Sequence, residues 1–94
     1  MKANSTSRDI DEIIKRLKAV LPGVQVTQLQ VGHPGADDDS LWIIKLPGKN
    51  GEVQIESPQG ECPFVIESDL NAERFHGQTV DEVVSTVRRL LGSL

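Results

Sequence analysis

Apolar residues recur at helical spacing in two segments of the chain. In the segment nearer the N-terminus, they lie three and four positions apart until Pro22-Gly23 ends the pattern. Asp9 with Glu12, or alternatively Ser7, is expected to cap the start of this helix. Its apolar stripe consists of Ile10, Ile13, Ile14, Leu17, Val20 and Leu21.

The second helical pattern lies near the C-terminus. Thr79 and Glu82 have the spacing of a capping box, in which each side chain binds a backbone N–H at the helix start. Arg88 and Arg89 are expected in the last turn, and Gly92 is expected to end the helix. The apolar stripe consists of Val80, Val83, Val84, Val87, Leu90 and Leu91.

Between these helices the pattern indicates four strands. Residues 24–31 alternate apolar and polar, with a change of phase between Val26 and Leu29, and residues 41–46 form a continuous apolar run. Residues 53–55 and 64–66 flank a Ser57-Pro58-Gln59-Gly60 turn, where Pro and Gly suit a type I turn. The polar segment 69–78 is expected to be a connection, held down by Leu70 and Phe75.

The order of these elements predicts an α+β fold. Short links favour an antiparallel four-stranded meander, and two amphipathic helices on one face give a two-layer sandwich of order α-β-β-β-β-α. Residues 1–7 are expected to form a flexible tail, and residues 8–94 a single domain. The uncovered face would be largely polar, although Trp42 or its neighbours, with Val65, could leave an apolar patch there.

Composition narrows the classes of partner. The 94 residues carry a net charge of −4, which argues against nucleic acid, because phosphate binding needs clustered Lys and Arg. Cys62 is the only cysteine, so neither an intramolecular disulfide nor a thiolate zinc cage is expected. The sequence has no signal-peptide pattern and no apolar run near the roughly 20 residues that span a bilayer. We therefore expect a cytoplasmic protein that binds neither nucleic acid nor a membrane.

No residue pattern specifies a catalytic centre, and no cofactor or metal site is expected. His33 and His76 lack helical ligand spacing, and the Asp37-Asp38-Asp39 run lacks the pattern of a calcium loop. The alternative from a different class is a small enzyme or ligand binder that uses Cys62 with His76 and Glu67. Such a cysteine would need a lowered pKa, and nothing in the sequence places either histidine beside it.

Acidic side chains form the candidate interaction surface. Strand alternation places Glu52 and Glu56 on one face, and the hairpin brings Glu67 to a neighbouring strand. This face is either an acidic interaction surface or an ordinary solvated sheet face. The candidate residues are Glu52, Glu56, Glu67, Asp37, Asp38 and Asp39.

The stretch GEVQIESPQGECPFVIESD, followed by TVDEVVSTVRRLL, resembles a group of small stand-alone bacterial α+β proteins, some of them immunity-protein-like. The resemblance covers roughly residues 40–91 and implies no catalytic residue. It implies a protein that neutralises a toxin by binding it. We therefore expect a non-enzymatic module that binds another protein, with a basic partner suiting an acidic surface. A structural homodimer formed through Leu41, Ile43 and Val65 is the remaining alternative.

Overall fold

The computed structural model describes residues 8–28, 41–49, 51–69 and 71–93. The expected tail at residues 1–7, the His33 loop and the Asp37-Asp38-Asp39 run lie outside these ranges. The elements are α1 (Asp9–Val20), β1 (Gln25–Gln28), β2 (Leu41–Lys45), β3 (Val53–Glu56), β4 (Phe64–Ser68), β5 (Asn71–Gly77) and α2 (Val80–Ser93).

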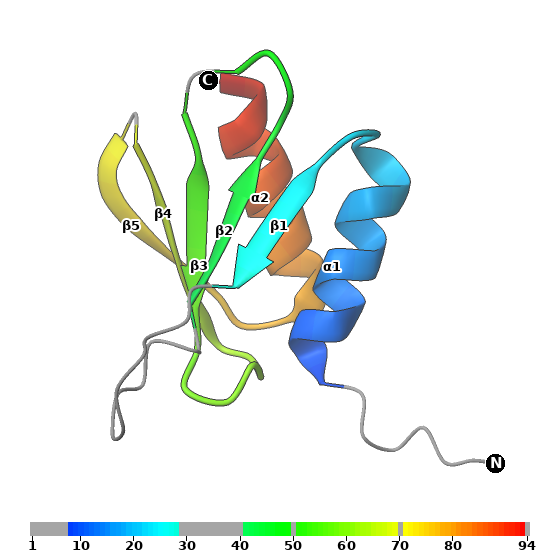
Figure 1. The fold of residues 1–94 in the computed structure, drawn as a ribbon. Helices are drawn as coiled ribbons and strands as arrows, with labels where there is room; N and C mark the ends of the chain where they lie inside the picture. Colours follow the sequence, from blue (N-terminus) through cyan, green and yellow to red (C-terminus); the bar gives the residue numbers. More distant parts are fainter. Residues whose placement is uncertain (1–7, 29–40, 50, 70, 94) are drawn as a thin grey trace, which may run out of the picture.

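The strands form one antiparallel sheet in which each strand pairs with its neighbour in the chain, in the order β1-β2-β3-β4-β5 (Figure 1). Both helices lie on the same side of this sheet, and α1 packs beside α2. The expected α+β class, antiparallel meander and two helices on one face are therefore confirmed. We call the side without helices the open face.

The prediction of four strands is wrong, because residues within the expected polar connection form β5. This strand pairs with β4, where Ile66 lies opposite Phe75 and Phe64 lies opposite Gly77. Phe75 is half-buried and packs against the core, while Gly77 is buried. A Cβ atom on Gly77 would lie 2.5 Å from Val83 Cγ2, so the close approach of α2 requires glycine here.

The core consists of aliphatic side chains with one aromatic pair. One row of paired residues that crosses all five strands under the helices consists of Gln28, Trp42, Ile55, Ile66 and Phe75. Trp42 is only 3% exposed and meets Phe64 edge-to-face, with 6.3 Å between ring centroids. Trp42 therefore belongs to the core, whereas its neighbours Leu41 and Ile43 are part-exposed, as is Val65, so only the Trp42 alternative of that expectation is wrong.

The helix ends differ in detail from the expected caps. Arg8 is the N-cap of α1, and its backbone N–H donates to Asp11 Oδ2 at 2.9 Å, so the cap is neither Asp9 nor Ser7. At α2, Glu82 N–H donates to Thr79 Oγ1 at 3.1 Å, as the capping box predicts. The helix continues through Gly92 to Ser93, so Gly92 does not end it and its last turn carries no basic residue.

Candidate functional site

Two rows of side chains on the open face follow the pairing of the strands. One row runs Thr27, Ile43, Gln54, Glu67 and Arg74, across all five strands. The other row runs Leu41, Glu56, Val65 and His76, across four strands. Because side chains alternate along each strand, the residues between these positions point to the helices.

Glu56 lies at the centre of an apolar group on this face. Its directly paired neighbours are Leu41 on β2 and Val65 on β4, and Ile43 lies diagonally beside it, opposite Gln54. These three aliphatic side chains are part-exposed, and Glu56 is exposed. We call Leu41, Ile43, Val65 and Glu56 the central patch.

The three carboxylates of the predicted acidic surface have different surroundings. Arg74 Nε lies 2.9 Å from Glu67 Oε2 and forms an ion pair across β4 and β5. Gln54 Nε2 donates to Glu52 Oε2 at 3.2 Å, just before β3. Among the residues that the structure describes, none forms an ion pair or side-chain hydrogen bond with Glu56.

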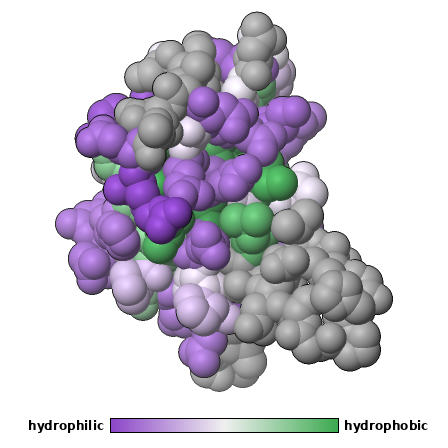
Figure 2. Space-filling view, turned by 90° about the vertical axis from the view of Figure 1, so that its left-hand side faces the viewer, coloured by the Kyte–Doolittle hydropathy of each residue, from purple (hydrophilic) through white to green (hydrophobic). Residues whose placement is uncertain are grey.

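The open face is mixed in charge. Lys45, opposite Gln25, and Arg74 both place a cation on it beside the carboxylates. Figure 2, which views the molecule from the β5 side, shows apolar surface near the centre of that view with hydrophilic side chains around it. Within the described residues, the candidate surface is therefore an apolar centre around Glu56, a carboxylate with no ionic partner there, and not the uniform acidic row that the sequence suggested.

Cys62 lies in the connection between β3 and β4, where it contacts the first turn of α1. Its backbone N–H donates to Asp9 Oδ2 at 2.8 Å. Burial, together with the negative charge of Asp9, raises the pKa of the thiol from 9.0 to about 11. The thiol is therefore protonated at neutral pH, the opposite of what an activated nucleophile requires.

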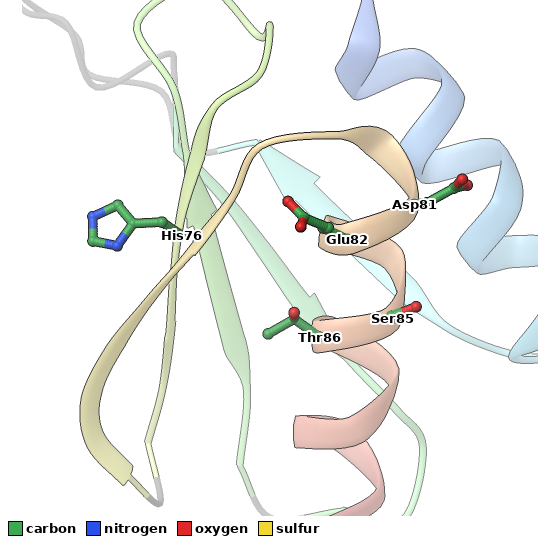
Figure 3. Close-up of a pocket in the computed structure, with 5 residues that line it drawn as sticks. All are labelled: His76, Asp81, Glu82, Ser85 and Thr86. Carbon is green, nitrogen blue, oxygen red and sulfur yellow. The ribbon is translucent and has the colours of Figure 1, made fainter.

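Cys62 and His76, two residues of the alternative enzyme site, line different hollows of the described structure. Cys62 lines a hollow of about 370 Å³ with Ser57, Pro58, Gln59, Glu61 and Pro63. His76 belongs instead to the wall of a separate, shallow hollow of about 280 Å³ against α2. Its side chain points away from Glu82 and Thr86 (Figure 3), so His76 does not converge with these two α2 residues.

The described ranges hold no group of three or more His, Cys, Asp or Glu side chains that could bind a metal ion. None of the helices in this part of the chain is both long and apolar enough to cross a bilayer.

Strand pairing supplies what the sequence alone could not. The sequence pattern places Arg74 and His76 in a connection and therefore predicts neither the ion pair with Glu67 nor the position of His76 opposite Val65. The alternation of polar Arg74 and His76 with Phe75 was the available signal. No protein-family model, curated protein or solved structure matches this chain.

Proposed function

We propose that this protein acts by binding another protein, and that the open face of the sheet is the surface that binds it. The observation that carries the proposal is the central patch, where Glu56 has no ionic partner among the described residues and is flanked by Leu41, Ile43 and Val65. Sheet faces are usually covered or polar, and apolar surface with polar surroundings is typical of interaction sites.

The partner that suits this surface is a basic protein. A net charge of −4 favours the approach of a cationic partner. Within the contact, the carboxylate of Glu56 would form a favourable ion pair with a cation of that partner. In its most specific form the proposal is an immunity-like or antitoxin-like role, in which binding covers the working surface of a basic toxin. Such a role requires no catalytic residue, and we assign no catalytic role to Cys62.

The experiment compares three immobilised proteins in extracts of the native host: the wild type, Glu56→Gln and the matched control Gln59→Lys. Both substitutions raise the net charge by the same amount, but Gln59 is exposed in the loop between β3 and β4. We expect the wild type and Gln59→Lys to retain the same basic protein at low salt, and Glu56→Gln to lose most of it. Raising the salt from about 50 to about 500 mM should release it, because exposed charges are screened.

Retention of the same proteins by all three baits would contradict the proposed surface. Failure of the wild type to retain any basic protein at low salt would contradict the proposed partner. A toxin gene beside the gene for this protein would support the immunity-like form.

A further inference from the structure

The central patch also indicates which group of the partner it receives. We infer that the patch binds one Lys or Arg side chain, whose aliphatic stem lies on Leu41, Ile43 and Val65 and whose cationic end pairs with Glu56. This inference rests on the proposed function, since it assigns the contact made at the same surface.

The position of Glu56 separates it from the other carboxylates nearby. β3 is the middle strand of the five, so Glu56 has a paired neighbour on each side. Directly opposed residues on one face have Cβ atoms about 4.5–5.5 Å apart, which places Leu41 and Val65 within reach of a ligand on Glu56. Glu67 is already occupied by Arg74, and Glu52 accepts from Gln54.

The apolar neighbours of Glu56 favour a cation with an alkyl stem. A partner that covered the patch with apolar groups alone would strip water from the carboxylate and leave it unpaired, which is costly. A Lys or Arg side chain avoids this cost, because its methylene groups cover apolar surface while its charged end reaches the acid. Exclusion of water by the aliphatic side chains then strengthens the charge-assisted hydrogen bond.

The same geometry disfavours a second copy of this chain on the patch. In a two-fold dimer the patch would meet itself, because the interface is isologous. An axis through the centre of the patch would then bring Glu56 of one copy against Glu56 of the other, and like charges in a contact are repulsive. In the homodimer alternative, the apolar residues of the patch would therefore favour association, but repulsion between the two Glu56 carboxylates would oppose it.

The inference is tested with small probes, so that no partner protein is needed. The protein is labelled at the methyl groups of Ile, Leu and Val and titrated with N-acetyl-lysine amide, N-acetyl-arginine amide and N-acetyl-norleucine amide. Norleucine keeps the alkyl stem and lacks the ammonium group. We expect the two cationic probes to shift the methyl resonances of Leu41, Ile43 and Val65 in a saturable way, with weak affinity in the millimolar range.

Three comparisons decide the outcome. Norleucine amide on the wild type, and lysine amide on Glu56→Gln, should bind at least about fivefold more weakly, whereas Gln59→Lys should bind the lysine probe as the wild type does. Equal shifts with lysine and norleucine amides would overturn the inference and leave an apolar binding face. Shifts spread over unrelated methyl groups, or unchanged in Glu56→Gln, would also overturn it. A failure of the proposed function would be seen in the other experiment, where immobilised Glu56→Gln would retain the same host proteins as the wild type.

Discussion

Asp9 and Cys62 are joined by a hydrogen bond of 2.8 Å, from the backbone N–H of Cys62 to Asp9 Oδ2. Asp9 N–H in turn donates to Glu61 Oε2 at 3.1 Å, and Ile10 N–H donates to the carbonyl oxygen of Gly60 at 2.9 Å. The loop between β3 and β4 therefore binds two of the N–H groups at the start of α1 that have no partner within the helix. These contacts fix one end of α1 to the sheet.

Removing the Asp9 carboxylate should destabilise the fold. Asp9→Ala leaves the Cys62 N–H without its acceptor and removes a negative charge from the first turn, with an expected loss of about 1–2 kcal/mol in the free energy of unfolding. Asp9→Asn should cost less, because the amide oxygen can still accept. Urea denaturation measures both, with the exposed Lys18→Ala as control. Equal stability of Asp9→Ala and the wild type would show that this contact contributes nothing.

Gly60 should tolerate no side chain. Its φ is +73°, and a Cβ atom would lie 2.9 Å from Ile10 Cγ2, so Gly60→Ala combines backbone strain with a clash. We expect a loss of about 1–3 kcal/mol in the free energy of unfolding. Gly92→Ala is the matched control, since nothing lies within 4 Å and the residue is helical. That variant should be neutral or more stable by up to about 1 kcal/mol, and the opposite ranking would contradict the described loop.

Alkylation of Cys62 should be slow at neutral pH and accelerate only at high pH. Because burial and the charge of Asp9 raise the thiol pKa to about 11, the rate with iodoacetamide should still be rising above pH 9. Asp9→Asn should lower this pKa, but not fully to 9.0, because burial is the larger cause. Fast alkylation of the Cys62 thiol near pH 7 would contradict the raised pKa and support the alternative enzyme site.

The same shift predicts how stability changes with pH. The unfolded thiol ionises near pH 9.0 while the folded thiol remains protonated to about pH 11, so the unfolded state binds fewer protons between these values. The contribution of Cys62 to the free energy of unfolding is therefore complete below pH 9 and decreases up to about pH 11. Denaturation of the wild type and Cys62→Ala across this range measures it. A parallel pH dependence of the two proteins would contradict the shift.

Charge substitutions on the open face should leave the fold intact. The Glu67–Arg74 pair is exposed, with 38% and 64% of the two side chains accessible, so Glu67→Gln should cost no more than about 1 kcal/mol. Glu56→Gln removes no described contact and should lie within about 0.5 kcal/mol of the wild type. Thermal unfolding of both variants tests this. A large loss for Glu56→Gln would mean that its binding defect reflects misfolding.

The sequence predicted the elements that have repeated apolar positions. Val53 with Ile55, and Phe64 with Ile66, mark the inward side of β3 and β4, so these strands and the outward direction of Glu56 follow from alternation alone. β5 could not be recognised in the same way. On the side of β5 that faces the helices, residue 77 is glycine, because Val83 lies too close for a side chain. The alternation of large apolar side chains that identifies β3 and β4 is therefore missing from β5.

The candidate site was predicted only in part, for the same reason. Without β5, the pairing of Glu67 with Arg74 could not be seen, and the carboxylates appeared equivalent. The role of Glu61 at the start of α1 was also hidden, since it depends on a contact between residues 52 positions apart. Local patterns do not record such contacts.

The central claim, that the open face is the binding surface, is tested most directly by photo-cross-linking in the native host. A photoreactive amino acid is placed at Ile43 on the open face, or at Lys18 on the exposed side of α1 as control. We expect a basic protein to be cross-linked from position 43 and not from position 18, and the product to disappear when Glu56→Gln is added. Cross-linking of that protein from position 18 alone, or only of a second copy of the chain from position 43, would contradict the account.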